Sequence, residues 1–270
     1  GTSSLESAAL GGLAHLVNFM GTDTVSALLA ARRYYHCDMA AFSIPAAEHS
    51  TITSWGREHE ADAYANMVKQ FAKPNQLVAV VSDSYDIYHA GSAIWGKQLQ
   101  AQVKASGGTV VIRPDSGSPA EVVPEILERL YTNYGGTTNN KGYRVLDPSV
   151  RVIQGDGVDI HSITVILDAI KAKGFSTENV AFGMGAGLLQ KVNRDTLSFA
   201  MKASAIRING QWQDVYKQPI TDLTKQSKRG RLAVIKENGS FKTVREDALN
   251  GRINQLRPIY ANGKLLLDEE

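Results

Sequence analysis

The feature that most constrains the fold of this chain is a repeated unit of an apolar run, a polar loop and a helix-like stretch. Residues 77–81 are apolar at every position, and residues 110–112 are apolar again before the loop at residues 113–117. Such runs are typical of parallel strands that are buried on both faces. The unit recurs about six times, so we predict an α/β fold, namely an irregular (β/α) barrel. A doubly wound sheet is the alternative.

Periodicity also gives the positions of the expected elements. Helices are predicted at residues 57–72, 87–105, 119–133 and 161–173, and strands at residues 16–19, 42–44, 77–81, 110–112, 151–153 and 179–182. The pattern changes beyond residue 190, where residues 204–208 and the following Asn209-Gly210 predict a β-hairpin. We therefore expect a catalytic barrel domain over residues 1–203 and a small antiparallel β-rich subdomain over residues 204–270.

Composition restricts the class of protein. The formal net charge of +2 gives no support for a nucleic-acid partner or a membrane surface. Cys37 is the only cysteine among 270 residues, so no internal disulfide is expected, which fits the cytoplasm. No apolar run approaches the roughly 20 residues that span a bilayer. The chain opens on Gly1, and we expect it to be a piece of a longer protein.

Charged residues gather in the loops that follow the apolar runs. In parallel α/β folds these loops meet at one edge and form the ligand site. Arginine binds phosphate oxygens and aspartate binds hard cations, so residues 113–117 suit a phosphorylated ligand and a divalent metal. A solvated Arg–Asp ion pair remains the alternative for any one loop. The charged loop residues are Asp23, Glu48, His49, Asp83, Asp86, Arg113, Asp115, Asp156 and Asp159.

Two further patterns allow more than one interpretation. The glycine run at residues 183–187 can cradle phosphate, but it matches neither the dinucleotide fingerprint nor a Walker loop. A basic cluster is interpreted as a solvated loop, and it consists of Lys225, Lys228, Arg229 and Arg231. From the residues alone, the chain is predicted to be an enzyme that handles a phosphorylated sugar or nucleotide with a divalent ion.

Six motifs add a resemblance to a known family. They are residues 21–24 (GTDT), 45–51 (PAAEHST), 82–86 (SDSYD), 112–117 (IRPDSG), 152–157 (VIQGDG) and 187–191 (GLLQK). In this order they resemble the nicotinamide phosphoribosyltransferases, which are type II phosphoribosyltransferases of NAD salvage. The resemblance extends from residue 1 to about residue 231. It departs from the family at Ala79, Met184 and Ala186, where the family commonly has serine or small residues.

The resemblance implies a reaction. Phosphoribosyl would pass from 5-phosphoribosyl-1-pyrophosphate to the ring nitrogen of nicotinamide, giving nicotinamide mononucleotide and pyrophosphate. Mg²⁺ would assist, and ATP would phosphorylate His49. The resemblance also implies a cytoplasmic homodimer with shared active sites. An upstream region with an Asp-Phe-Gly-x-Arg-Gly motif would end at Gly1 and supply the aromatic residues around nicotinamide.

The resemblance also assigns roles to individual residues. His49, Arg113 and Asp115 would be catalytic, with Arg113 near the pyridine and phosphoribose and Asp115 holding ribose or the metal through water. Asp23 would accept a hydrogen bond from the nicotinamide amide and repel the carboxylate of nicotinate. The remaining substrate-binding residues would be Asp83, Gly155, Asp156, Gly185, Ala186, Arg194 and Lys202. Two alternatives stay open: a nicotinate or quinolinate phosphoribosyltransferase, and a non-catalytic nucleotide-binding homologue.

Overall fold

The computed structural model describes residues 2–192 and 200–266, in two compact units. The first unit contains residues 1–201 together with residues 217–226, and the second contains residues 202–216 and 227–270. Segment 217–226 thus returns to the first unit after a hairpin of the second. The domain boundary expected at residue 203 stays a prediction.

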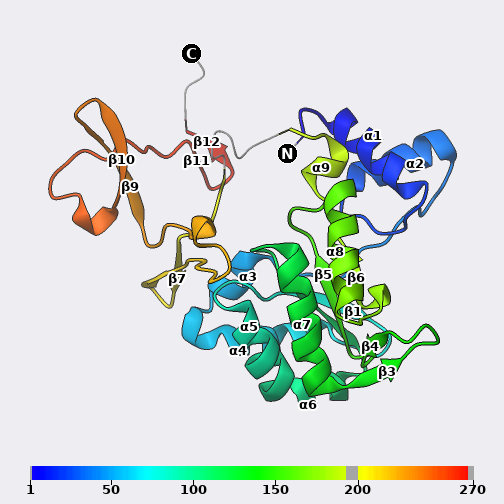
Figure 1. The fold of residues 1–270 in the computed structure, drawn as a ribbon. Helices are drawn as coiled ribbons and strands as arrows, with labels where there is room; N and C mark the ends of the chain where they lie inside the picture. Colours follow the sequence, from blue (N-terminus) through cyan, green and yellow to red (C-terminus); the bar gives the residue numbers. More distant parts are fainter. Residues whose placement is uncertain (1, 193–199, 267–270) are drawn as a thin grey trace. The chain divides into compact units, whose positions relative to one another are not determined.

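The first unit is built on a parallel sheet in the order β1-β2-β5-β6. Figure 1 labels β1, β5 and β6 of this sheet. Its strands are β1 (Leu77–Val81), β2 (Thr109–Arg113), β5 (Val150–Gln154) and β6 (Val180–Phe182). They correspond to four of the six predicted strands, namely those at residues 77–81, 110–112, 151–153 and 179–182. In β1 and β2, residues of both faces are buried, as expected for strands of continuous apolar character.

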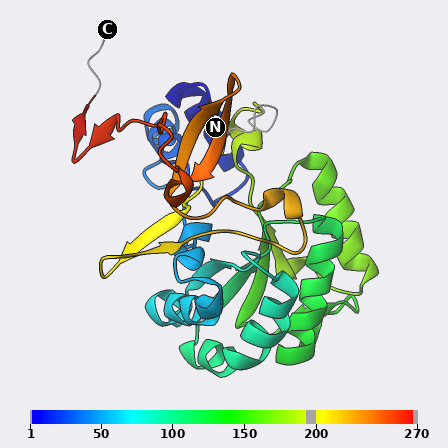
Figure 2. The ribbon, with the colours of Figure 1, turned by 90° about the vertical axis from the view of Figure 1, so that its left-hand side faces the viewer.

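The helices of this unit precede, separate and follow the strands in the sequence, and those coloured cyan to green lie against the sheet (Figure 2). They are α1 (Leu5–Leu16), α2 (Val25–Tyr35), α3 (His49–Thr53), η1 (Arg57–His59), α4 (Glu60–Phe71), α5 (Ile87–His89), the π-helical η2 (Ala90–Gln98), α6 (Gln100–Ser106), α7 (Pro119–Tyr134), α8 (Ile160–Ala172), η3 (Thr177–Asn179), α9 (Ala186–Leu189) and η4 (Leu223–Lys225). The helix predicted at residues 87–105 is therefore interrupted by a π-helical segment.

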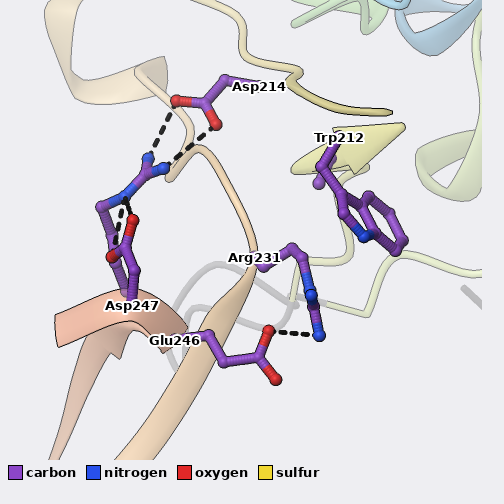
Figure 3. Close-up of a pocket in the computed structure, with 7 residues that line it drawn as sticks. Trp212, Asp214, Arg231, Glu246 and Asp247 are labelled. Atoms are coloured by element: carbon purple, nitrogen blue, oxygen red, sulfur yellow. Dashed lines mark hydrogen bonds and ion pairs between the residues drawn. The ribbon is translucent and has the colours of Figure 1, made fainter. Parts of the chain in front are cut away.

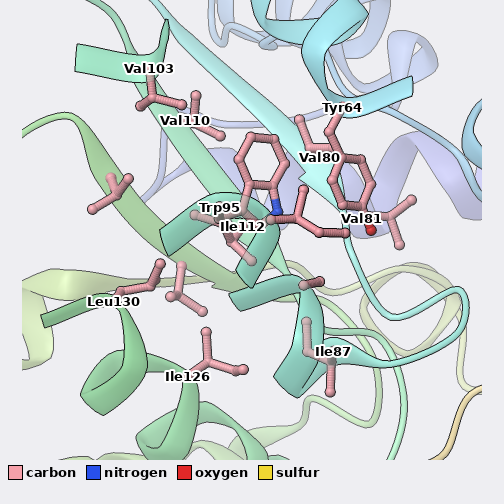
Figure 4. Packing of buried hydrophobic residues seen from close by; sticks show 14 of the residues in the cluster. Tyr64, Val80, Val81, Ile87, Trp95, Val103, Val110, Ile112, Ile126 and Leu130 are labelled. Carbon is pink, nitrogen blue, oxygen red and sulfur yellow. The ribbon is translucent and has the colours of Figure 1, made fainter. Parts of the chain in front are cut away.

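One hydrophobic core joins the helices to the sheet (Figure 4). Val80 of β1 and Ile112 of β2 pack there against Trp95, whose indole stacks on the ring of Tyr64 with 4.8 Å between centroids. The core also contains Val81, which points to the face of β1 opposite to Val80 because successive strand residues alternate. The polar loops leave the carboxyl edge of the sheet.

The first two predicted strands differ from the structure. The strand predicted at residues 16–19 is wrong, because α1 continues to Leu16 and Val17 keeps helical dihedral angles. Val17 and Phe19 are mostly exposed, so no buried face favours a strand there. The strand predicted at residues 42–44 is reduced to one parallel bridge between Phe42 and Gly21. A second bridge, between Ala46 and Ala79, places the next residues beside β1.

The described residues form an α/β fold with an open parallel sheet, and within them no ladder joins β6 to the first segments. The start of the chain nevertheless lies beside residues 189–190, which follow β6. Ser3 donates through its backbone N–H to Oε1 of Gln190 at 2.7 Å, and Gly11 of α1 lies directly against the backbone of Leu189. The unit also contains a short hairpin of β3 (Gly136–Thr138) and β4 (Arg144–Leu146).

The second unit consists of short antiparallel hairpins. They are formed by β7 (Ala205–Ile208) with β8 (Gln211–Asp214), β9 (Leu232–Glu237) with β10 (Ser240–Arg245), and β11 (Tyr260–Ala261) with β12 (Lys264–Leu265), and η5 (Glu246–Ala248) follows β10. Each turn is an Asn-Gly pair with positive φ at both residues, for example 48° at Asn209 and 82° at Gly210. The hairpin predicted from Asn209-Gly210 is confirmed. Across the described residues, no helix has the length and apolar character to cross a bilayer.

Candidate active site

Three carboxylates lie at the same relative position on three neighbouring strands. Asp83, Asp115 and Asp156 each stand two residues beyond the end of β1, β2 and β5. These strands are adjacent and parallel, with Val81 paired to Arg113 and Ile112 to Val152. Because the carboxyl ends of such strands meet at one edge, the loops that carry the three carboxylates share that edge.

A buried histidine meets the first of these carboxylates. His49 is the first residue of α3, which begins after Glu48, whose carboxylate accepts the N–H of Ser50 at 2.7 Å. Nε2 of His49 lies 3.1 Å from Oδ1 of Asp83 and 3.9 Å from Oδ2 of Asp115. The structure thus brings together His49, Asp83 and Asp115, which the sequence places up to 66 residues apart.

Lys217 completes this cluster, and sequence reasoning missed it. Its ammonium donates to Oδ2 of Asp83 at 2.8 Å and lies 2.8 Å from Nε2 of His49. Burial alone would raise the pKa of Asp83, but the adjacent side chains of His49 and Lys217 hold that pKa well below its usual range. Asp83 is therefore an anion that is buried and neutralised by one cation.

Segment Lys217–Gln226 reaches the three loops through several hydrogen bonds. The N–H of Gln218 donates to Ser84 O and that of Ile220 donates to Tyr85 O, both at 2.9 Å. The hydroxyls of Thr221 and Ser116 lie 2.6 Å apart. The segment is therefore held against the loops that follow β1 and β2.

Lys225 lies at the far end of the same segment. It donates to the backbone oxygen of Asp115 at 3.1 Å and forms an ion pair with the carboxylate of Asp156. The sequence interpretation treated Lys225 as part of a solvated loop, whereas here it joins two of the acidic loops. No sequence pattern links Lys217 or Lys225 to its carboxylate partner, because each lies 69 or more residues from that partner.

Arg113 ends β2 and has an unused donor. Its Nε is buried and has no hydrogen-bond partner within the described residues. Gly155 lies beside it: a Cβ at Gly155 would stand 4.0 Å from Cδ of Arg113 and 3.8 Å from Oδ1 of Asp115. Since buried donors are nearly always satisfied, the free Nε suits a ligand acceptor at this edge.

The glycine run continues the edge beyond β5. Gly183 donates through its N–H to Gln154 O at 2.8 Å, so the loop after β6 follows the end of β5. Gly185 is exposed with open space around it, and α9 begins at Ala186. The run at residues 183–187 is thus accessible to a ligand.

Three further residues are predicted to bind substrate. Asp23 is exposed and accepts a hydrogen bond from the hydroxyl of Ser43. Lys202 is exposed and belongs to the second unit. Arg194 lies outside the described residues. No hydrogen bond or ion pair of the described residues joins Asp23 to the cluster around His49, and the roles of Asp23, Lys202 and Arg194 stay predictions.

No group of three or more potential metal ligands exists within the described residues. Mg²⁺ needs fewer, because it commonly binds one or two carboxylates together with substrate phosphates and waters. Asp83 and Asp156 are already paired with lysines. Asp115 has His49 as its only ion-pair partner within the described chain, so Asp115 is the carboxylate that fits a metal.

A separate hollow of about 380 Å³ lies in the second unit (Figure 3). Its charges are paired: Arg245 with Asp214 at 2.9 Å and with Asp247 at 3.4 Å, and Arg231 with Glu246. Arg231 also lies over the ring of Trp212. Because each of these charged side chains has an ion-pair partner, the hollow offers no unpaired charge to a substrate.

A charged site at the carboxyl edge of a parallel sheet is typical of the α/β enzymes. Comparison with known families makes the class specific: the model of the nicotinate phosphoribosyltransferase (NAPRTase) family matches residues 1–263. The chain belongs to this family.

Several curated relatives are similar to this chain. It is 56% identical to a nicotinamide phosphoribosyltransferase of Xanthomonas campestris pv. campestris (strain 8004), over 98% of the chain and 58% of that protein. It is 37% identical to a nicotinamide phosphoribosyltransferase of Mycoplasma pneumoniae, over 86% of the chain and 51% of that protein. A third, from Acinetobacter baylyi, is 31% identical over 99% of the chain and 57% of its own length. The chain spans little more than half the length of these relatives.

Proposed function

We propose that this chain forms the main part of a nicotinamide phosphoribosyltransferase. The enzyme transfers phosphoribosyl from 5-phosphoribosyl-1-pyrophosphate to nicotinamide, and it couples this transfer to ATP hydrolysis through His49. The observation that carries the proposal is the buried cluster of His49, Asp83 and Lys217 beside Asp115, at the carboxyl edge of the sheet. The 56% identity to a relative with this activity supports it.

The chemistry needs electrostatic stabilisation rather than a general base. The pyridine nitrogen of nicotinamide is neutral and nucleophilic at pH 7, so no proton has to be removed. The ribosyl centre becomes positive as its bond to pyrophosphate breaks, and the departing pyrophosphate gains negative charge. Arg113, with its unused Nε donor, would bind the donor's oxygens, and Asp156 would accept from ribose hydroxyls.

The glycines and the metal would complete the binding of the donor. Gly155, Gly185 and Ala186 would present backbone N–H groups to the 5′-phosphate. Asp115 would hold Mg²⁺ directly or through water, and the ion would neutralise pyrophosphate charge.

His49 would accept the phosphoryl group of ATP. A ring nitrogen would form the N–P bond with its lone pair, while the bond from the γ-phosphorus to the bridging oxygen breaks and its electrons leave with ADP. Water would later hydrolyse the N–P bond. A phosphoryl group at His49 would lie near Asp115 and any metal held there, since Nε2 of His49 is 3.9 Å from that carboxylate.

The wider architecture follows the same proposal. The irregular (β/α) barrel would be completed by strands in addition to β1, β2, β5 and β6, and the contact of Ser3 with Gln190 supports such closure. The enzyme would be a cytoplasmic homodimer in which Arg194 and Lys202 bind pyrophosphate across the interface.

Asp23 would select the base. A carboxylate accepts from the amide of nicotinamide but repels the carboxylate of nicotinate. A nicotinate enzyme and a non-catalytic homologue remain the competing functions, and the family's name alone does not separate them.

The test is an assay of the full-length protein with the phosphoribosyl donor, Mg²⁺ and either base, with and without ATP. We expect nicotinamide mononucleotide, with kcat/KM for nicotinamide at least about 100-fold above that for nicotinate. Asp23→Asn should narrow this ratio, and Arg113→Ala should lower kcat/KM by about 100-fold while the thermal unfolding midpoint is kept. Equal use of both bases would contradict the assignment, and intact binding without product would favour the non-catalytic homologue.

A further inference from the structure

We propose that Lys217 is a positioning residue for the reaction at His49. In the resting protein it holds the imidazole through Nε2, and it turns its ammonium to the phosphoryl group when the ring is phosphorylated. This inference rests on the proposed function and adds a residue that neither the motifs nor the sequence pattern assigned.

The first step of the argument is the position of the ammonium. Nζ of Lys217 is 2.8 Å from both Nε2 of His49 and Oδ2 of Asp83. The side chains of Lys217 and Asp83 are only 5% and 1% exposed. A buried ammonium is stable only where acceptors surround it, and these two atoms are acceptors in hydrogen-bond range.

The second step is a count of protons. Nε2 also lies 3.1 Å from Oδ1 of Asp83. One ring nitrogen carries either a proton or a lone pair, so Nε2 cannot donate to Asp83 and accept from Lys217 at the same time. The contact with Lys217 is the shorter one, and the ammonium has donors for both neighbours. The geometry assigns Nε2 as the acceptor and places the ring proton on Nδ1.

The third step is the charge that phosphorylation brings. A phosphoryl group on His49 would add negative charge between two carboxylates, since Asp83 and Asp115 both lie within 4 Å of Nε2. In the described part of the chain, Lys217 is the cation in hydrogen-bond range of this ring. It can release Nε2 and donate to a phosphoryl oxygen while it keeps its contact with Asp83, because an ammonium has three donors.

The fourth step is how the lysine is held. The residues after it are fixed to the loop that carries Asp83, because Gln218 and Ile220 donate to the backbone oxygens of Ser84 and Tyr85. The lysine and its carboxylate therefore move together. A position built by backbone contacts suits a group that must align a nucleophile.

The experiment compares three variants of the full-length protein. Lys217→Met removes the charge and Lys217→Arg keeps it. Lys242→Met is the matched control, since Lys242 forms an exposed ion pair with Glu237 at 3.6 Å. The first measurement is acid-labile label on the protein after mixing with ATP that carries a radioactive γ-phosphate. The second is the nitrogen-15 NMR signal of the His49 ring.

We expect Lys217→Met to slow labelling by about 100-fold, as is typical for loss of one charge-stabilising donor. Lys217→Arg should restore part of the rate, and Lys242→Met should stay within about twofold of the wild type. In Lys217→Met the Nε2 signal should move from the acceptor range to the protonated range, because Nε2 then donates to Asp83. A destabilised protein with an unchanged site would not show this shift.

Wild-type labelling in Lys217→Met, or an unmoved Nε2 signal, would overturn the inference. If Lys217→Met does not fold, the double variant Asp83→Asn/Lys217→Met removes both buried charges, and the inference requires it to lose labelling as well. A wild-type protein that forms no mononucleotide would instead overturn the proposed function. Failure of the inference alone would appear as normal product and normal labelling in Lys217→Met.

Discussion

The two ends of segment Lys217–Gln226 make the same chemical contact in different surroundings. At the buried end, Lys217 meets Asp83, with side chains 5% and 1% exposed. At the open end, Lys225 meets Asp156, with side chains 33% and 47% exposed. The buried pair is a fixed part of the protein, whereas water or a ligand can replace either partner of the open pair.

A neighbouring carboxyl group shows what burial does without a lysine. Glu60 at the start of α4 is buried and accepts a hydrogen bond from the hydroxyl of Tyr64 at 2.8 Å. Burial raises the pKa of Glu60 to about 7, and the hydrogen bond from Tyr64 and the charge of Arg57 only partly oppose this. Asp83 moves in the opposite direction because Lys217 and His49 outweigh its burial. The groups that contact a buried carboxyl therefore decide whether its pKa is raised or lowered.

The largest expected effect is at the buried end. Asp83→Ala leaves the ammonium of Lys217 buried without its counter-charge, and this should lower the free energy of unfolding by about 3–5 kcal/mol. Asp156→Ala, at the open end, should cost no more than about 1 kcal/mol. Urea unfolding at pH 7 measures both values. Equal losses would show that burial does not separate the two pairs.

The dependence of stability on acidic pH also tests the pair of Lys217 and Asp83. The folded pKa of Asp83 is lowered, so its stabilising contribution is complete above the unfolded value of about 3.9 and is lost as the pH falls towards the folded value. Asp83→Asn should therefore flatten the loss of stability below about pH 4. If the free energy of unfolding of Asp83→Asn fell with decreasing pH as steeply as that of the wild type, this prediction would be contradicted.

The second largest effect concerns Glu60, whose raised pKa makes stability depend on pH in the direction opposite to that of Asp83. Its folded pKa of about 7 exceeds the unfolded value of about 4.3, so the folded state binds more protons between these values and stability falls as the pH rises through this window. Glu60→Gln keeps an oxygen that accepts from Tyr64 but carries no charge. At pH 8 it should be more stable than the wild type by about 2–3 kcal/mol, and at pH 4 the two should be similar. Thermal unfolding across this range tests it, and a variant that is less stable at pH 8 would contradict it.

The sequence predicts the sheet well where a strand has a buried face. β1, β2 and β5 are found where the sequence predicts strands, since apolar runs such as those of β1 and β2 are typical of buried parallel strands. The run at residues 16–19 has similar residues but continues α1, because Val17 and Phe19 are largely exposed. Apolar character alone therefore does not fix a strand when tertiary burial is absent.

Some residues of the candidate site can likewise be predicted from the sequence, and others cannot. Asp83, Asp115 and Asp156 are predictable because each follows a strand at the same distance, and adjacent parallel strands bring such positions to one edge. Lys217 is not predictable, because it lies 134 residues from Asp83 in a segment without periodicity. Its role depends on a chain return that only the fold reveals.

The smallest effect on stability is expected at the open end. Lys225→Met should change the free energy of unfolding by less than about 1 kcal/mol, because its pair with Asp156 is partly exposed and screened by salt. Its effect on binding should be larger than its effect on stability. Lys225 is a cation on the loops of Asp115 and Asp156, so its removal should raise KM for the anionic phosphoribosyl donor by about three- to tenfold.

Lys228→Met is the matched control for this change, since Lys228 is exposed and donates only to the hydroxyl of Thr243 within the described residues. It should leave KM within about twofold of the wild type. The KM effect of Lys225→Met should shrink as salt is raised, because screening weakens attraction between exposed charges. If Lys225→Met destabilised the protein as much as Asp83→Ala, the open pair would be a structural element like the buried one, and the distinction between the two ends would fail.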